Sequence, residues 1–265
     1  MPAPVPLDWY DTPLYYDIIF DEDTTLEADF LEVVHGRHGD GARQNRSVLE
    51  LACGSGRLMK ELGARGWKTA GFDSNATMLD FARNRMDTAG LNAVLWKDRM
   101  ENFTVPRKQR FDLVHCLVST FKYLLSERDA LACLLRVADT LKPGGLFILG
   151  IHLSDYRHPK ISHERWVVTR DGVEVVCNTR TWPSPSGSRL EAMRSRLKVT
   201  LPGGEIHRQE TLWNVRSYSA DQLRRLVGKV ESLDLVACHD FRHDPEDHRK
   251  LDDSYSDIVL VLKRR

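Results

Sequence analysis

Residues 48–62, VLELACGSGRLMKEL, decide the fold, because a short apolar run is followed there by a glycine turn and then by a helical pattern. Gly54 and Gly56 lie where a strand passes into a helix, and a tight turn at that point needs positive φ angles and a close approach of the backbone to a ligand. A dinucleotide site would carry a third glycine at Met59, and a GxxxxGK[ST] phosphate loop occurs nowhere in the chain. The stretch therefore predicts a strand, a ligand-binding turn and a helix, and it disfavours a nicotinamide dinucleotide or a nucleoside triphosphate as the ligand.

Strand and helix patterns alternate along the chain from this stretch to residue 153. The expected strands are 47–52, 67–73, 92–98, 111–118 and 146–153, and the expected helices are 24–37 before them and 56–66, 75–90 and 126–142 between them. Parallel neighbouring strands need crossover connections, which helices supply. The pattern therefore predicts an α/β fold with a doubly wound parallel sheet.

The pattern changes after residue 153. Strand-like segments at 164–182, 188–201 and 205–218 are separated or interrupted by the turns Asp171-Gly172, PSPSG at 183–187 and Pro202-Gly203-Gly204. A helix from residue 219 and two strands, 232–241 and 256–265, follow. We therefore predict an N-terminal helical cap segment (1–45), a core (46–153 and 217–265) and an inserted antiparallel subdomain (154–216) that serves as a substrate lid or a dimer contact.

Acidic residues mark the ends of three successive strands of the predicted core. Glu50 precedes the first glycine of the turn, where it would repel a pyrophosphate but would suit a ligand that carries an ammonium and a sulfonium. Asp73 ends the next strand, where a carboxylate accepts hydrogen bonds from both hydroxyls of a ribose. Asp98 ends the third strand and can accept a hydrogen bond from an adenine amino group. The three acids predict a site for a cationic ligand without phosphate.

Five blocks of sequence, ELACGSG, GFDSNATMLDFAR, KDRMENF, FDLVHCLVSTFKYL and LKPGGLFIL, resemble in this order the class I S-adenosylmethionine-dependent methyltransferases. The resemblance runs from about residue 47 to residue 153. It implies a Rossmann-like seven-stranded sheet whose last strand, residues 256–263, is antiparallel to the others. It also implies S-adenosylmethionine as the cofactor, bound by Glu50, Ala52, Gly54, Gly56, Asp73, Ser74, Met78, Asp98, Arg99, Met100 and Leu117. In this assignment the glycines pack under the methionine portion, Asp73 holds the ribose, and residues 98–100 bracket the adenine.

The N-terminal segment LYYDIIFDED (14–23) and the hairpins resemble the subgroup that methylates small molecules, including the glycine or sarcosine and the aminosugar N-methyltransferases. That resemblance implies that a tyrosine, Tyr16 or Tyr15, folds over the cofactor. The chain lacks a [DN]PP[YFW] block after the fourth strand, and Cys116 does not follow a proline, which disfavours the methylation of nucleic acid bases. We expect a small-molecule acceptor, with N-methylation slightly ahead of O-methylation. The alternative is a protein of the same fold that binds the cofactor without turnover.

Methyl transfer depends mainly on positioning, which can supply roughly 7 to 11 kcal/mol of the barrier, so the lack of a catalytic dyad in the sequence does not count against an enzyme. A base would help to deprotonate an alkyl amine. His152 at the end of the fifth strand and Tyr123 after the fourth are the candidate catalytic residues, with Ser119 and Phe121 nearby. Arg57 could clamp a carboxylate, but an arginine in a first helical turn is more often solvated.

Composition limits the other classes of function. Lys plus Arg and Asp plus Glu are both 38 in 265 residues, so a nucleic acid partner is disfavoured. Five scattered cysteines without a CxxC pair indicate a reducing compartment and no zinc site, and His239, His243 and His248 fit no standard ligand set, so no metal is expected. The longest apolar run is too short to span a membrane, which favours the cytoplasm. A homodimer stays open.

Overall fold

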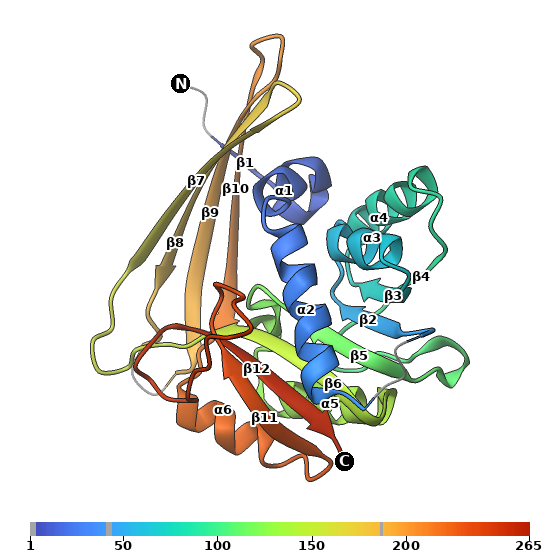
Figure 1. Ribbon diagram of the computed structural model, residues 1–265. Coiled ribbons are helices and arrows are strands. Elements are labelled where there is room, and N and C mark those ends of the chain that lie inside the picture. Colours follow the sequence, from blue (N-terminus) through green and yellow to red (C-terminus); the bar gives the residue numbers. More distant parts are fainter. Residues whose placement is uncertain (1–3, 41–43, 186–187) are drawn as a thin grey trace.

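The computed structural model describes residues 4–40, 44–185 and 188–265, which form two β-sheets with helices packed on them (Figure 1). Part of the expected PSPSG turn at 183–187, and residues 1–3 and 41–43 of the expected cap segment, lie outside the described residues. Within the described part of the chain, no helix is both long and apolar enough to cross a membrane.

The larger sheet has seven strands in the order β11-β12-β6-β5-β2-β3-β4. They are β2 (Ser47–Leu51), β3 (Lys68–Asp73), β4 (Ala93–Lys97), β5 (Phe111–Cys116), β6 (Leu141–His152), β11 (Leu233–His239) and β12 (Asp257–Arg264). Strand β12 is antiparallel to both of its neighbours, and the pairs from β4 to β6 are parallel. The predicted seven-stranded sheet with an antiparallel last strand is therefore confirmed. The strand order reverses between β2 and β5, where open α/β sheets bind ligands.

Helices cover both faces of this sheet (Figure 1). They are α2 (Thr24–His38), α3 (Arg57–Ala64) and α4 (Ala76–Thr88) on one face, and α5 (Glu127–Thr140) and α6 (Ala220–Val227) on the other. Successive side chains of β2 point to opposite faces of the sheet. Val48 therefore packs with α2 and α3, whereas Leu49 packs with α5 and α6. Each such side chain contributes roughly 1.5 to 3 kcal/mol on full burial. Helix α5 has a side-chain cap, because Ser126 Oγ accepts a hydrogen bond from Asp129 N at 3.0 Å.

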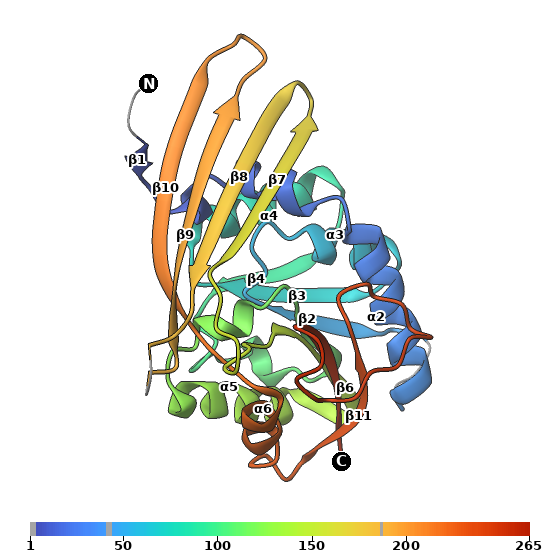
Figure 2. The same ribbon diagram turned by 90° about the vertical axis from the view of Figure 1, so that its left-hand side faces the viewer.

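The smaller sheet has the order β1-β10-β9-β8-β7. Its hairpin strands are β7 (Ser162–Arg170), β8 (Val173–Trp182), β9 (Leu190–Thr200) and β10 (Ile206–Arg216), and the two-residue β1 (Val5–Pro6) pairs with β10. Asp171 and Gly172 have φ angles of +51° and +76°, as a tight hairpin turn requires. One face of the sheet packs on the N-terminal segment, and Figure 2 shows that no other element covers the opposite face.

The N-terminal segment contains two elements that the sequence did not reveal, the 3-10 helix η1 (Trp9–Asp11) and the helix α1 (Pro13–Phe20). Helix α1 lies between the five-stranded sheet and helices α3 and α4 (Figure 1). It is eight residues long and has no side-chain cap at Thr12, so tertiary contacts rather than local signals hold it. The segment thus joins the insertion to the edge of the core where β2 ends.

Candidate cofactor and acceptor site

The turn after β2 has the geometry that the sequence predicts. Gly54 and Gly56 have φ angles of +51° and +71°. A Cβ at Gly56 would lie 3.0 Å from the Cβ of Ala82 on α4, so a side chain there is both strained and crowded. Gly54 N donates a hydrogen bond to Asp73 Oδ2 at 2.9 Å, which ties the turn to the end of β3.

Asp73 is buried at the end of β3 and accepts two backbone hydrogen bonds, one from Gly54 N and one from Asn75 N at 2.8 Å. Burial raises the pKa of its carboxyl, against the effect of these bonds. Ser74 is exposed beside it, and Met78 is fully buried in the first turn of α4. The acid therefore shapes the turn as well as presenting a carboxylate at the strand end.

Glu50 lies on β2 directly opposite His115 on β5. Glu50 Oε2 and both ring nitrogens of His115 are buried and have no hydrogen-bond partner among the described residues. Burial, against the attraction of Arg57, raises the pKa of Glu50 to about 8. Burial also lowers the pKa of His115 to about 3, so this imidazole is neutral at physiological pH. A buried acid without a full set of partners is a place where a ligand cation would be stabilised.

Arg57 is buried, with an exposed fraction of 8%, whereas an arginine in a first helical turn is usually solvated. Its guanidinium lies 2.5 Å from Glu27 Oε2 and donates to Thr24 Oγ1 at 3.0 Å, and both partners belong to α2. The difference arises because α2 packs on α3 and brings Glu27 to the arginine. Arg57 therefore supports the base of the site from α3.

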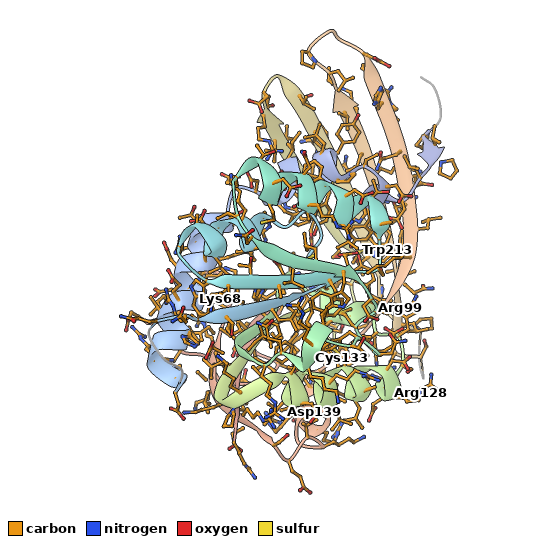
Figure 3. All side chains as sticks on the ribbon, turned by 90° about the vertical axis from the view of Figure 1, so that its right-hand side faces the viewer. Lys68, Arg99, Arg128, Cys133, Asp139 and Trp213 are labelled. Atoms are coloured by element: carbon orange, nitrogen blue, oxygen red, sulfur yellow. The ribbon has the colours of Figure 1, made fainter. Side chains whose placement is uncertain are left out.

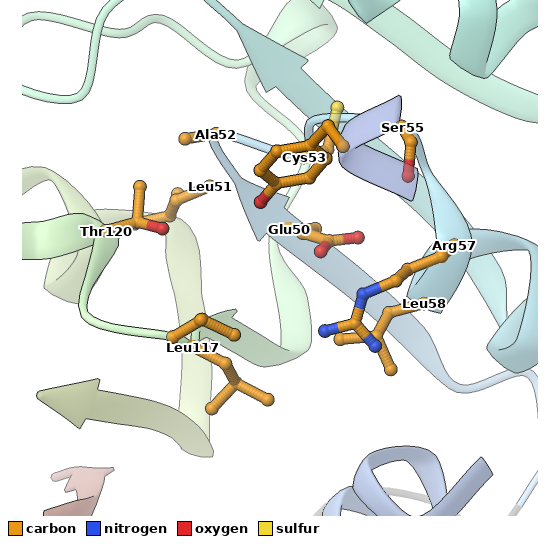
Figure 4. Close-up of a pocket in the computed structure, with 11 residues that line it drawn as sticks. Glu50, Leu51, Ala52, Cys53, Ser55, Arg57, Leu58, Leu117 and Thr120 are labelled. Carbon is orange, nitrogen blue, oxygen red and sulfur yellow. The ribbon is translucent and has the colours of Figure 1, made fainter. Parts of the chain in front are cut away.

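Tyr16 of α1 lies over the glycine turn, and its Cε1 would be 3.6 Å from a Cβ at Gly54. Tyr16, Glu50, Ala52, Leu117 and nearby residues line a small cavity of about 30 Å³ (Figure 4). Tyr16 thus covers the turn closely, at the place that the resemblance implies.

Asp17, next to Tyr16, fixes α1 in this position. Its carboxylate is fully buried and accepts hydrogen bonds from Ser55 Oγ at 2.7 Å and from Arg170 of β7 at 2.8 Å, and it also pairs with Arg85 of α4. Burial alone would raise the pKa of Asp17, but these partners outweigh burial and hold the pKa below its usual value. One carboxylate thus joins α1 to the turn, to α4 and to the five-stranded sheet.

The residues that are expected to bracket the adenine lie in the loop after β4. Asp98 accepts hydrogen bonds from Arg99 N and Thr104 N, both at 2.9 Å, and its own backbone N donates to Asp73 O at 3.1 Å. Arg99 is exposed and pairs with Glu101, whereas Met100 is buried (Figure 3 labels Arg99). The structure therefore brings Asp98 next to Asp73, with its carboxylate engaged in closing the loop.

Aromatic rings from three elements pack together on the side of the site where the methyl acceptor is expected. Tyr10 Oη donates to Tyr123 Oη at 2.8 Å, and Tyr123 contacts Trp213 of β10, which lies where the five-stranded sheet meets the core (Figure 3). Burial raises the pKa of Tyr123 far above its usual value, so the phenol stays protonated at neutral pH and is unsuited to act as a base. Phe121 is fully buried in the core.

The loop after β5 is strained, because Val118 and Ser119 have φ angles of +54° and +62°. Ser119 Oγ accepts a hydrogen bond from the backbone N of His152 at 2.8 Å, which fixes the end of β6. His152 is half-exposed, and its Nδ1 lies 2.6 Å from Asp257 Oδ1 of β12. Asp257 could not be identified from the sequence, because nothing near residue 257 in the chain points to residue 152.

The chain is similar in sequence to known methyltransferases. Residues 48–145 match the family described as methyltransferase domain. A Streptomyces venezuelae enzyme, dTDP-3-amino-3,4,6-trideoxy-alpha-D-glucopyranose N,N-dimethyltransferase, is 27% identical over 184 residues, which are 66% of this chain and 72% of that protein. Residues 48–145 therefore match a methyltransferase domain, and the chain has the Rossmann-like fold of S-adenosylmethionine-dependent methyltransferases. Two solved structures with this fold, CalS10 from Micromonospora echinaspora and the glycopeptide N-methyltransferase MtfA, contain S-adenosylmethionine.

Two further similarities show how much of this chain other proteins match. The putative methyltransferase YqeM of Bacillus subtilis (strain 168) is 28% identical over 107 residues, which are 40% of this chain and 42% of that protein, so the match spans less than half of this relative. An S-adenosylmethionine-dependent methyltransferase from Clostridium acetobutylicum ATCC 824 superposes with a TM-score of 0.76 at 21% identity, covering 97% of this chain and 99% of the other. This second similarity extends the shared fold to the insertion and the N-terminal segment.

The three histidines at the end of β11 and in the loop after it pack mainly against other rings. His239 and His243 pack against Phe30 of α2, with ring centroids 5.1 and 5.3 Å apart, and His248 packs on His239. Within the described ranges 4–40, 44–185 and 188–265, no group of three or more His, Cys, Asp or Glu side chains is arranged to hold a metal ion.

Proposed function

We propose that this methyltransferase transfers a methyl group to the amino group of a small molecule, with an aminosugar as the first class to test. The observation that carries the proposal is the pairing of a cation-binding turn, flanked by Glu50 and Asp73, with a histidine and carboxylate pair at the end of the neighbouring strands. The Streptomyces venezuelae relative supports an aminosugar as the acceptor. O-methylation of a small molecule, and binding without turnover, are the alternatives.

When bound, S-adenosylmethionine supplies a methyl carbon on a positively charged sulfur. Glu50 would hold the ammonium of the methionine portion, and Asp73 would accept hydrogen bonds from the ribose hydroxyls. Asp98, Arg99 and Met100 would bracket the adenine. Tyr16 would exclude water from the turn, which strengthens the electrostatic interactions beneath it.

His152 would take the proton that an alkyl ammonium must lose before its nitrogen can attack. An amine with a pKa near 10 costs about 4 kcal/mol to deprotonate at pH 7, so a positioned base lowers the barrier. His152 is preferred to Tyr123 because the Tyr123 phenol is protonated and already engaged with Tyr10. Most of the rate acceleration still comes from alignment of the nitrogen with the methyl group.

Titration calorimetry with S-adenosylhomocysteine tests the cofactor site. We expect S-adenosylhomocysteine to bind and NAD not to bind. Asp73→Asn is expected to weaken S-adenosylhomocysteine about 10- to 100-fold, because hydrogen bonds to a charged acceptor are worth about 1.5 to 3 kcal/mol. Asp80→Asn, an exposed carboxylate on α4 that pairs with Arg83, is the matched control and should leave the affinity unchanged. Equal affinities of the two variants would show that Asp73 does not hold the ligand.

A screen of amines and phenols with radiolabelled cofactor tests the acceptor. We expect amines, and aminosugar nucleotides among them, to be methylated faster than phenols. Faster methylation of phenols would favour the O-methyltransferase alternative, and cofactor binding without any turnover would favour the binding protein. The proposal also includes a cytoplasmic location and a homodimer. The cytoplasmic location is supported by the five cysteines, which are all free and buried.

A further inference from the structure

His152 and Asp257 face each other across two strands although they are 105 positions apart in the chain. His152 ends β6, and Asp257 begins β12, which pairs with β6 in antiparallel register so that these two residues are directly opposite. Directly opposite residues of a sheet project from the same face. The distance of 2.6 Å between His152 Nδ1 and Asp257 Oδ1 is that of a charge-assisted hydrogen bond.

The pair belongs to the same sheet edge as the cofactor turn. Ser119, in the loop after β5, accepts the hydrogen bond of the His152 backbone and donates its own N–H to Gly150 O at 3.2 Å. A Cβ at Gly150 would lie 3.3 Å from Leu117 Cα and 3.4 Å from Val118 N. Leu117 and Val118 line the cavity beneath Tyr16. His152 therefore lies two residues along β6 from Gly150, which packs against two residues of the cavity lining, and its side chain is half-exposed.

The groups that surround the imidazole leave Asp257 as its one charged contact within the described ranges. Phe241, after β11, packs against the His152 ring with centroids 4.8 Å apart, and His243 stacks on Phe241 at 6.1 Å. Burial lowers the pKa of His243, so this second imidazole is neutral near pH 7. Ser119 contributes a hydroxyl that is already bonded to the backbone. Within the described part of the chain, Asp257 is therefore the charged side chain that pairs with this ring.

We propose that Asp257 is a positioning residue that accepts the Nδ1 proton of His152, fixes the tautomer whose Nε2 carries the lone pair, and so makes His152 the base of the reaction. This inference rests on the proposed function. His152 Nε2 takes one proton from the acceptor ammonium and becomes an imidazolium that Asp257 stabilises. The neutral amine nitrogen then forms a bond to the methyl carbon, the carbon–sulfur bond breaks, and its electron pair stays on the sulfur as a neutral thioether. The half-exposed ring returns its proton to solvent.

Nitrogen NMR of the imidazole rings tests the positioning role without any acceptor. The His152 ring, assigned by comparison with His152→Gln, is expected as the Nδ1-protonated tautomer in the wild type and as a tautomer mixture or the Nε2-protonated form in Asp257→Asn. Asp234→Asn, a carboxylate on β11 that pairs with Arg265, is the matched control and should leave the His152 signals unchanged. An Nε2-protonated His152 in the wild type would overturn the proposal.

Kinetics with the amine that the acceptor screen identifies tests the catalytic consequence. His152→Gln is expected to lower kcat about 10² to 10⁴-fold with little change in the KM for S-adenosylmethionine. Asp257→Asn should lower kcat less, about 10- to 100-fold, because it disturbs the orientation of the base and leaves the base itself in place. Unchanged rates in both variants would overturn the inference while leaving N-methylation intact, whereas failure to bind S-adenosylhomocysteine would overturn the proposed function itself.

Discussion

Arg57→Met is expected to lower the free energy of unfolding by about 3 to 5 kcal/mol, the usual cost of leaving one partner of a buried ion pair alone. Arg57 and Glu27 are exposed by only 8% and 4%, and their charged atoms lie 2.5 Å apart. Removal of the guanidinium leaves Glu27 without its cation and takes away the hydrogen bond to Thr24. Equilibrium unfolding in urea, followed by circular dichroism, measures the loss.

Two further variants separate the buried pair from a general effect of removing an arginine. Arg83→Met removes a half-exposed arginine that pairs with Asp80 on α4, and it should cost less than about 1 kcal/mol. The double variant Arg57→Met/Glu27→Leu should recover most of the stability, because an apolar pair of similar volume replaces a buried ion pair at little cost. Equal losses in Arg57→Met and Arg83→Met, or a double variant no more stable than Arg57→Met, would contradict the role assigned to the pair.

The affinity for S-adenosylhomocysteine is expected to increase about tenfold for each pH unit between pH 6 and 7.5. The pKa of Glu50 is raised to about 8 by burial, so the free protein carries this group protonated over that range. An ammonium beside Glu50 favours the carboxylate, so the bound state must release the proton. Each pH unit below the pKa then costs about 1.4 kcal/mol, or a factor of ten in affinity. Calorimetry across this range measures the slope, and buffers of different ionisation enthalpy measure the release of about one proton.

Glu50→Gln removes the group that titrates and keeps its size. This variant should bind S-adenosylhomocysteine with an affinity that changes little between pH 6 and 7.5. The charged groups that act on Glu50 are Arg57, Glu27 and Asp73. Asp80→Asn, the exposed carboxylate on α4, therefore serves as the control, because it leaves these groups in place and should keep the slope. A wild-type affinity that does not change with pH would show that Glu50 does not meet the ligand ammonium.

The helices and strands of the core could be predicted from local patterns in the sequence. The period of apolar residues marked the helices α3, α4 and α5 and the strands between them, because burial on one face imposes that period whatever the partner is. The turn at Gly54 and Gly56 was predictable because positive φ angles require glycine there. Tyr16 could be placed over the turn only by resemblance, since α1 is short and lacks a side-chain cap.

The sequence by itself determined the doubly wound sheet and the acids at the ends of the parallel strands, because strand ends of one sheet meet at one edge. The antiparallel last strand was implied by the family resemblance. Only the tertiary structure decided which side chains pair across that edge. Asp257 reaches His152 through the register of β12 on β6, and Asp17 gathers Ser55, Arg85 and Arg170 from three other elements. Such contacts join residues far apart in the chain, and their geometry depends on how the layers pack, which no local pattern of residues encodes.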